Sequence, residues 1–271
     1  MSAADLIRTR RSVRTFDGNG LPDEMLEMIR EYAETVTNPY GIRTAFTFLS
    51  SKEQPLKVPV ITGTDMFIAG TVRRVSHAEE AFGYAFEKIL LYAWSLGVGS
   101  TWIAGTMDRA AFEQAIGLEE GEAMPCISPL GMPAARMSFR ETMMRKGVGA
   151  DKRLASDKLF FEDIYGSPLK TDDPALKEAL EMVRLAPSAV NKQPWRAVVR
   201  DGRVHFYESP SRGYRSEDGW DLQKIDMGIA LCHFEMAAQE AGLQTSFELE
   251  EPDIEVPAGI EYIASFVLHK Q

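Results

Sequence analysis

The stretch Ala186-Pro187-Ser188-Ala189-Val190-Asn191-Lys192-Gln193-Pro194-Trp195 governs the interpretation of the whole chain. It follows a helix-like run, 174–185, and precedes a short apolar stretch, 197–199. Its two prolines rule out a continuing helix and favour extended geometry at the residues before them. Ser188 and Asn191 have short polar side chains that bond either a turn backbone or a ligand. The stretch therefore predicts a helix-to-strand turn, and both a structural and a ligand-binding role stay open.

Length and composition set the class of protein. The chain has 271 residues, which allows one large core or two fused halves. Its net charge of −10 disfavours nucleic acid, because phosphate binding requires a basic surface. No apolar run approaches the ~20 residues that cross a bilayer, and residues 1–14 do not resemble a secretory signal. Only two cysteines, Cys126 and Cys232, are present. We therefore expect a soluble cytoplasmic protein that binds neither nucleic acid nor membrane.

A local basic cluster departs from this acidic background. Arg8, Arg10, Arg11 and Arg14 fall within seven residues, next to Ser12. One interpretation is a solvated helix end or a basic surface arm. The other is a phosphate site, because planar guanidinium groups match phosphate oxygens two at a time.

Periodicity and capping residues predict the elements of a mixed α+β protein. Asp108 and Gly117 bracket one helix, and Arg200-Asp201-Gly202-Arg203 predicts a hairpin turn. The expected helices are 3–9, 22–36, 78–96, 108–116, 174–185 and 222–241. The expected strands are 45–49, 58–61, 197–199, 204–207, 243–249 and 262–268, with 124–130 at most an edge strand. Residues 131–157 are expected to form a long connecting segment, and 209–219 a loop.

The two halves of the chain resemble each other. Leu26-Glu27-Met28-Ile29-Arg30 matches Leu180-Glu181-Met182-Val183-Arg184, and each precedes a proline-bearing turn and an apolar strand. Small residues also recur at one constant offset: Gly83, Ala85, Ala93, Gly97 and Ser100 correspond to Gly228, Ala230, Ala238, Gly242 and Thr245. Both matches keep the same chain order, so we predict an internal duplication with halves 1–157 and 158–271.

The duplication is unequal. The arginine–serine cluster precedes only the first half, and the Pro-Ser-x-x-Asn turn belongs only to the second. If the halves pack about a pseudo-two-fold axis, two related clefts arise at their seam. Only one of them receives both features, which predicts one site per chain.

These motifs resemble those of the nitroreductase family, flavin-dependent reductases whose dimers bind FMN at the subunit interface. Arg10-Arg11-Ser12-Val13-Arg14 is similar to the family's Arg-x-Ser-x-Arg/Lys, and 186–195 to its Ala-Pro-Ser-x-x-Asn-x-Gln-Pro-Trp. Residues 97–105 resemble its glycine-bearing turn, and 129–133 its Leu-Gly-x-Pro element. The likeness spans nearly the whole chain and is greatest to a branch in which one polypeptide mimics the dimer. It implies a nitroreductase-like α+β fold, with two related halves whose central sheets are flanked by helices.

The resemblance also implies site residues. Arg10, Arg11 and Ser12 would hold the FMN phosphate, with Arg145 and Lys146 completing that site. Arg14 would approach the pyrimidine edge of the flavin. Backbone N–H groups near Ala104 and Gly105 would face the reactive ring nitrogen, although many family members have an acidic residue where this chain has Ala104. The other half would contribute Pro187, Ser188, Ala189 and Asn191.

The implied activity is an FMN-dependent oxidoreductase that passes hydride from NADH or NADPH to a nitroaromatic, quinone-like or similar small acceptor. No side chain is identified as a catalytic acid or base, and no metal motif occurs. Two alternatives stay open: a flavin-binding storage or sensor protein without turnover, and a structural protein whose residues 8–14 form a surface arm. A monomer is one expectation for a chain that mimics a dimer. The physiological acceptor, the choice of nicotinamide cofactor and further association stay open.

Overall fold

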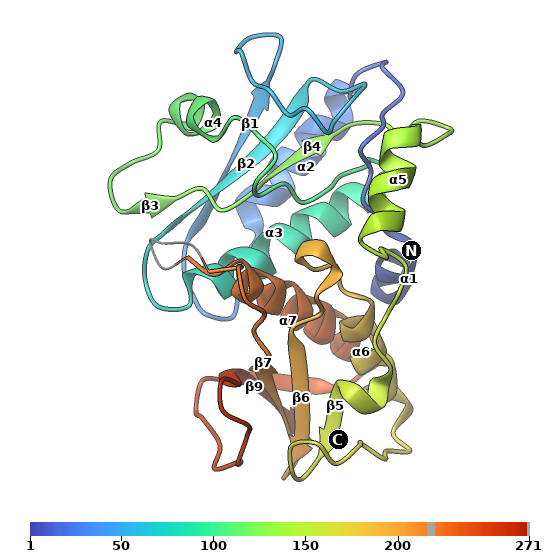
Figure 1. The fold of residues 1–271 in the computed structure, drawn as a ribbon, viewed down its shortest axis with the longest axis vertical. Coiled ribbons are helices and arrows are strands. Elements are labelled where there is room, and N and C mark those ends of the chain that lie inside the picture. The colour runs from blue at the N-terminus through green and yellow to red at the C-terminus, as the bar shows by residue number, and fades with distance from the viewer. Residues whose placement is uncertain (216–219, 270–271) are drawn as a thin grey trace. The chain divides into compact units, whose positions relative to one another are not determined.

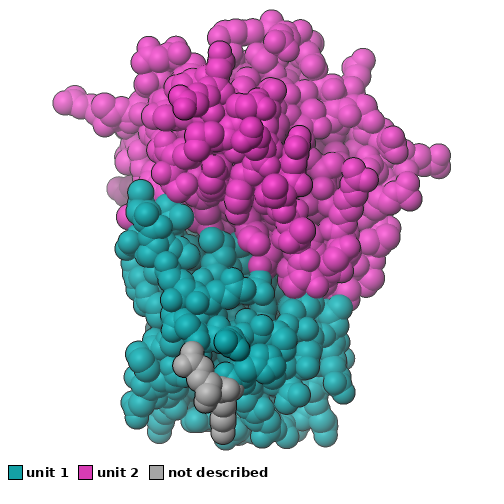
Figure 2. Space-filling view, turned by 180° about the vertical axis from the view of Figure 1, so that it is seen from behind, with its two compact units in different colours: residues 1–8, 150–271 teal, residues 9–149 magenta. Residues whose placement is uncertain are grey.

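The computed structural model describes residues 1–215 and 220–269. The chain forms two compact units: residues 1–8 with 150–271 make unit 1, and residues 9–149 make unit 2 (Figure 2). This partition by compactness differs from the predicted halves 1–157 and 158–271, and the duplication itself stays a prediction. No helix among the described residues is long and apolar enough to cross a membrane.

Unit 2 is an antiparallel sheet with helices on its faces (Figure 1). Strand β2 (Met66–Arg73) pairs with β1 (Thr44–Ser50) on one side, and with β3 (Glu122–Ala123) and β4 (Ile127–Leu130) on the other. The remaining elements are the helices α2 (Asp23–Thr35), α3 (Ala78–Ser95), α4 (Arg109–Ile116) and α5 (Phe139–Gly147).

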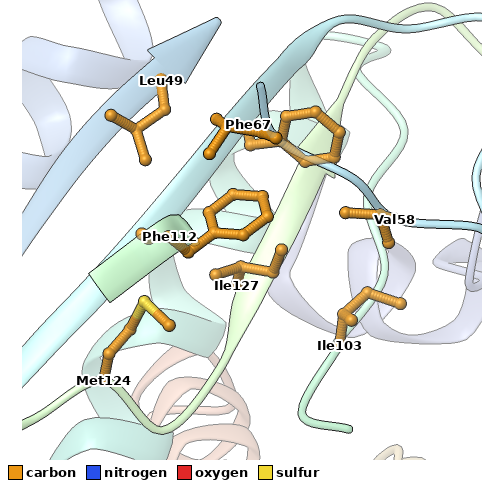
Figure 3. Packing of buried hydrophobic residues seen from close by; sticks show 9 residues of the cluster. Leu49, Val58, Phe67, Ile103, Phe112, Met124 and Ile127 are labelled. Carbon is orange, nitrogen blue, oxygen red and sulfur yellow. The ribbon is translucent and has the colours of Figure 1, made fainter. Parts of the chain in front are cut away.

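Two apolar layers cover the sheet of unit 2. On one face Phe46 of β1 packs against Phe82 and Phe86 of α3, with ring centroids 6.4 and 5.5 Å apart. On the other face Phe67 of β2 meets Phe112 of α4 edge-on, with centroids 5.5 Å apart. Figure 3 shows this second cluster, whose labelled members are Leu49, Val58, Phe67, Ile103, Phe112, Met124 and Ile127. Burial on both faces fixes the register of β2, because a one-residue slip would exchange the two layers.

Unit 1 contains a five-stranded sheet of order β5-β6-β7-β9-β8. Only β5 and β6 run parallel; the other neighbours are antiparallel. The strands are β5 (Phe160–Glu162), β6 (Trp195–Arg200), β7 (Arg203–Glu208), β8 (Gln244–Glu248) and β9 (Glu261–His269). The helices are α6 (Pro174–Leu185), α7 (Leu222–Glu240) and most of α1 (Ala3–Thr9).

The two units share an order of elements. In unit 2 the order is α2, the β1–β2 hairpin and α3, and β4 then pairs with β2. In unit 1 it is α6, the β6–β7 hairpin and α7, and β9 then pairs with β7. The long helices α3 and α7 also end alike, because Gly97 and Gly242 follow them, each at a φ of 82°. The shared order is what a duplication predicts.

Most predicted elements are confirmed, including the mixed α+β class and the helices 78–96, 174–185 and 222–241. Asp108 caps α4 by accepting the Ala111 N–H, and Asp201 and Gly202 take the positive φ of the hairpin turn. The predicted helix at 22–36 begins one residue later, with Pro22 at its cap. Part of the predicted loop 209–219 lies outside the described residues; 209–214 contain no helix or strand.

Two predictions are wrong. Residues 58–61 form a turn rather than a strand, closed by the Ile61 N–H on the Val58 carbonyl at 3.0 Å. The strand of that region is β2, which the sequence analysis did not predict. The segment 131–157 is not simply a connection, because it contains α5. Ser138 caps this helix by accepting the Glu141 N–H at 3.1 Å.

Candidate functional site

The arginine-bearing segment that follows α1 is held in an extended conformation by backbone hydrogen bonds on both sides. Val13 N–H bonds the Ser100 carbonyl at 2.9 Å, and Phe16 N–H bonds the Thr62 carbonyl at 2.9 Å. The carbonyl of Arg14 accepts the Thr62 N–H at 3.0 Å. Because its backbone is fixed at these points, the segment presents its side chains in set directions, with Val13 and Phe16 buried in unit 2.

A glycine allows the turn at residues 62–64 to approach the arginine-bearing segment closely. Gly63 has φ +83°, and a Cβ atom there would lie 2.2 Å from the Phe16 carbonyl oxygen. No side chain fits at that distance, so the turn at residues 62–64 requires glycine to support the arginine-bearing segment.

Arg10 is fixed by a buried carboxylate of the long helix α3. Its Nε lies 3.2 Å from Glu87 Oε1, and the two side chains are 4% and 0% exposed. Trp102 Nε1–H donates to the other oxygen, Glu87 Oε2, at 2.8 Å. Both oxygens of Glu87 are therefore used, and the orientation of the Arg10 guanidinium is set by α3.

Helix α5 is anchored directly to the same segment. Thr15 Oγ1 and Ser138 Oγ are 3.0 Å apart, and the Ser138 N–H bonds Thr15 Oγ1 at 3.1 Å. Figure 1 shows α5 beside this stretch of the chain. The anchor brings buried Glu141 to within 3.8 Å of the Arg11 guanidinium. It also places Arg145, one turn further along α5, near Arg14.

Buried guanidinium nitrogens without a hydrogen-bond partner among the described residues occur at Arg11 and at Arg14. The atom at Arg14 is its Nε. Burial lowers the pKa of Arg14, and the positive charges of Arg145 and Arg10 lower it further, against the opposing effect of Glu141. Glu141 is thus close to both Arg11 and Arg14, and Arg145 adds a further positive charge beside them. The donor set fits an anionic ligand that would supply additional acceptors.

The predicted turn at Ala104 and Gly105 lies after the bridge that joins Ile103 to Ile127. Its geometry is set by Arg109, at the start of α4. The Arg109 guanidinium donates to the carbonyls of Ala104 at 2.8 Å and Pro125 at 3.3 Å, and also to the Met124 carbonyl. Gly105 is exposed, and a Cβ added to it would meet nothing within 4 Å. The sequence analysis missed Arg109, which orients the carbonyl side of this turn.

The Pro-Ser-x-x-Asn turn of unit 1 is strained. Val190, Asn191 and Gln193 all have positive φ, at 50°, 56° and 52°. A β-branched residue such as Val190 rarely adopts this conformation, and its side chain is also 58% exposed. Backbone strain of this kind costs about 1–3 kcal/mol per residue and persists only where the surroundings impose it.

Several contacts impose the conformation of this turn. Both carboxylate oxygens of Asp226, on α7, accept the Ala189 N–H at 3.0 Å. Ser188 Oγ accepts the Gln193 N–H at 2.9 Å. The segment after residue 150 supplies the rest, because Lys152 O accepts from the Asn191 amide at 2.9 Å and Leu154 N–H donates to Gln193 Oε1 at 2.8 Å.

The carboxylates beneath the turn are themselves perturbed. Asp226 is fully buried, and this burial raises its pKa well above 3.8, opposed by the Ala189 N–H. Burial together with the charges of Asp221 and Glu261 raises the pKa of Glu208 to about 8. At neutral pH the carboxyl group of Glu208 therefore favours its protonated form.

The predicted site residues fall into two groups, one in each compact unit. Unit 2 holds Arg10, Arg11, Ser12, Arg14, Ala104, Gly105, Arg145 and Lys146. Unit 1 holds Pro187, Ser188, Ala189 and Asn191. Within unit 2 the structure gathers Arg10, Arg11, Arg14 and Arg145, whereas Lys146 is exposed. The sequence analysis missed the residues that hold these groups in place: Glu87, Trp102, Arg109, Glu141, Asp226 and Arg153, whose Nη1 donates to Asn191 Oδ1 at 3.3 Å.

Comparison with known proteins identifies relatives. A family model described as "Putative TM nitroreductase" matches residues 3–238. No curated protein matches the sequence. A crystal structure described as a putative nitroreductase from Thermotoga maritima is similar over 99% of this chain and 94% of its own, with 20% identity and a TM-score of 0.64. This likeness extends through both units and establishes the fold.

Smaller proteins match about half of the chain. One is an FMN-dependent nitroreductase from Clostridium difficile, with 19% identity, a TM-score of 0.41 and coverage of 52% of this chain and 94% of its own. Another is an iodotyrosine deiodinase whose structure holds FMN and 3-iodo-L-tyrosine, with 15% identity, a TM-score of 0.42 and coverage of 50% and 92%.

Proposed function

The chain belongs to the nitroreductase family whose model it matches, and from this premise we propose that it is an FMN-dependent oxidoreductase. In this proposal it takes hydride from NADH or NADPH and reduces a nitroaromatic, quinone-like or similar small acceptor. It binds one flavin per chain, with residues of unit 2 and of the Pro-Ser-x-x-Asn turn in unit 1 both contributing. The cytoplasmic location expected from the sequence belongs to the same proposal.

The observation that carries the proposal is the arginine cluster of unit 2. Four guanidinium groups come from one short extended segment and the last turn of α5, and Arg14 keeps a buried Nε without an acceptor among the described residues. Arg10 and Arg11 have carboxylate partners, Glu87 and Glu141, whereas the Arg14 Nε has no hydrogen-bond acceptor among the described residues. The electron-rich pyrimidine edge of FMN would supply an acceptor to Arg14, and the phosphate would bind to Arg11 and Arg145.

The chain's residues have distinct roles in this proposal. Bound FMN would supply the two-electron chemistry. Arg11, Ser12 and Arg145 would bind its phosphate, and Arg10, oriented by Glu87, would add a further donor. Arg14 would stabilise the negative charge that reduction places on the ring, because a fixed cation in a buried site does so without reorganising. The strained turn would orient Ser188 and Asn191 towards the cofactor, and Asp226 would hold that turn.

A matched pair of variants on α5 tests the phosphate site. Arg145→Ala removes a cation beside Arg14, whereas Lys146→Ala removes an exposed cation one residue away. FMN affinity, measured by quenching of flavin fluorescence, is expected to fall about tenfold or more for Arg145→Ala, since one charge-assisted hydrogen bond contributes about 1.5–3 kcal/mol. It should change by less than about twofold for Lys146→Ala. Equal losses in the two variants would contradict the assignment of Arg145.

An anaerobic titration separates the oxidoreductase from a storage or sensor protein. Reconstituted protein is mixed with NADH or NADPH while its visible spectrum is followed. Bleaching of the flavin band by either cofactor, and its return when a quinone is added, supports the proposed turnover. A yellow protein that neither cofactor bleaches would instead favour flavin binding without turnover.

A further inference from the structure

A buried carboxylate lies among the arginines of unit 2, and the proposed function gives it no role. Glu141 of α5 is 1% exposed, and neither of its carboxylate oxygens has a hydrogen-bond partner among the described residues. Buried polar atoms are almost always hydrogen-bonded, and an ionised carboxylate accepts at both oxygens. Its place in a site for a phosphorylated ligand requires an explanation, because a carboxylate repels phosphate.

The neighbouring arginines do not hydrogen-bond Glu141. Arg11 Nη1 lies 3.8 Å from Glu141 Oε1, a separation that makes an ion pair but is too long for a hydrogen bond. Elsewhere in the chain an arginine closes on its carboxylate with two hydrogen bonds: Arg184 binds both oxygens of Glu181, at 2.7 and 2.6 Å. The ion pair with Arg11 therefore leaves the hydrogen-bonding capacity of Glu141 unused.

The start of α5 explains why this carboxylate is available. Ser138 and Glu141 have the capping-box pattern Ser-x-x-Glu, in which the glutamate side chain normally accepts the backbone N–H of the serine. Here the Ser138 N–H donates to Thr15 Oγ1 at 3.1 Å instead. Only the other half of the box forms, from the Glu141 N–H to Ser138 Oγ at 3.1 Å. Thr15 thus takes the place of the Glu141 carboxylate at the cap, and the carboxylate faces the arginines.

The unpaired atoms of this cluster are of both kinds. Arg11 Nη1 and Arg14 Nε are buried donors without an acceptor among the described residues, and the Glu141 oxygens are buried acceptors without a donor. Glu141 is close to Arg14 as well as to Arg11, because its charge opposes the lowering of the Arg14 pKa by burial. Unpaired donors beside unpaired acceptors fit a ligand group that both accepts and donates hydrogen bonds.

A hydroxyl group meets this requirement, because it has one O–H donor and two lone pairs. A fully ionised phosphate does not, since it only accepts hydrogen bonds and is repelled by the carboxylate. In the proposed function Arg11 binds the phosphate of FMN and Arg14 binds the pyrimidine edge of its ring. The part of FMN that joins phosphate to ring is the ribityl chain, which carries hydroxyl groups. A carboxylate near both arginines is therefore expected to meet this chain.

We propose that Glu141 binds a ribityl hydroxyl group of FMN, which donates to the carboxylate and accepts from Arg11 or Arg14. Glu141 thereby selects a flavin whose chain is hydroxylated. Thr15 keeps the carboxylate available by occupying the Ser138 N–H. The inference rests on the proposed function, because it concerns how the same site recognises its cofactor.

A matched pair of ligands isolates this contact. One ligand is FMN, and the other is an FMN analogue in which an unsubstituted five-carbon chain joins the ring to the phosphate. The affinity of the full chain for each ligand is measured by quenching of flavin fluorescence, and the ratio of the two affinities is compared between variants. Both ligands have the same ring and phosphate, so the ratio cancels any effect of a variant on the binding of those parts.

Glu141→Ala should lower the ratio about tenfold or more, because it removes a hydrogen bond to a charged acceptor. Glu141→Gln keeps a neutral acceptor and should give an intermediate ratio. The control is Glu31→Gln, at an exposed carboxylate of α2, which should leave the ratio unchanged. A ratio that Glu141→Ala does not change would overturn the inference and leave the proposed function standing. Absence of binding of both ligands to the unmodified protein would overturn both.

Thr15→Val tests why the carboxylate is available. The variant removes the acceptor of the Ser138 N–H, so the Glu141 side chain should turn to that N–H and complete the capping box. The ratio should then fall as far as in Glu141→Ala, and combining the two changes should lower it by less than about twofold more. An unchanged ratio in Thr15→Val, or losses that add in the double variant, would overturn the role inferred for Thr15.

Discussion

The carboxylate of Asp226 accepts the backbone N–H of Ala189 with both oxygens, each 3.0 Å from the nitrogen. This contact joins the central helix α7 to the strained turn of the same unit. The contact fixes the peptide group of Ala189, which directly precedes Val190 and Asn191, the residues with positive φ. Asp226 therefore acts as a positioning residue for the turn.

Substitution of Asp226 tests this role. Asp226→Ala removes the acceptor, so the turn should relax and FMN affinity should fall about tenfold, in proportion to one lost hydrogen bond of about 1.4 kcal/mol. Asp226→Asn keeps one oxygen for the Ala189 N–H and should restore most of the affinity. Flavin fluorescence measures the affinity, and exchange of the Ala189 amide reports on the contact. Equal affinity in both variants would show that the contact does not position the turn.

The buried pair between Arg10 and Glu87 should contribute to stability far more than an exposed pair. Glu87→Gln leaves the Arg10 guanidinium, 4% exposed, without its counter-charge and should lower the free energy of unfolding by about 3 kcal/mol. The control is Glu178→Gln at the pair with Arg8, whose side chains are 42% and 37% exposed, and it should cost less than about 1 kcal/mol. Urea unfolding measures both. Similar costs would mean that Glu87 does not hold Arg10.

Two glycines with nearly equal φ allow the cost of backbone strain to be measured separately from the cost of a steric clash. At Gly18, φ +85°, a Cβ atom would meet nothing within 4 Å, whereas at Gly63, φ +83°, it would lie 2.2 Å from the Phe16 carbonyl oxygen. Gly18→Ala should therefore cost only the backbone strain, about 1 kcal/mol. Gly63→Ala should cost several times more and should also weaken FMN binding, because it displaces the arginine-bearing segment. Thermal unfolding with a parallel FMN titration distinguishes the two.

Stability should fall as the pH rises through the range in which Glu208 titrates. Burial raises its pKa from 4.5 to about 8, so the folded state holds a proton that the unfolded state releases near pH 4.5. The contribution of the Glu208 proton to the free energy of unfolding is fully present below pH 4.5. It is lost progressively as the pH rises to about 8, at up to about 1.4 kcal/mol per pH unit. Glu208→Gln should flatten this slope in urea unfolding between about pH 5 and 8. An unchanged slope would contradict the role of Glu208, and exposed Glu250→Gln serves as the control.

Elements with a capping residue at each end could be predicted from the sequence. Asp108 and Gly117 marked α4, because capping residues act over a few residues. Helix α5 was missed because its exposed face carries Phe139 and Met143, which hides the amphipathic period, although Ser138 was available as a cap. At 58–61 the apolar residues face the core from a turn, so composition alone indicated a strand.

The sequence motifs predicted the candidate ligand-binding residues better than the residues that hold them. Arg14 and Asn191 belong to short motifs, whereas Glu87 and Asp226 act on residues far away in the chain. Glu87 lies on the long apolar helix 78–96, and a carboxylate buried on such a helix requires a partner, so this was the available signal. Which partner it has depends on tertiary packing and could not be predicted from spacing.

The amount of FMN bound per chain tests the central claim most directly. Purified protein is incubated with excess FMN, passed over a desalting column, and its visible absorbance at the flavin band is compared with its protein concentration. We predict one FMN per chain, with binding lost when Arg14 and Asn191 are both changed to alanine. A protein that stays colourless, or one that binds FMN equally well after both changes, would contradict the account.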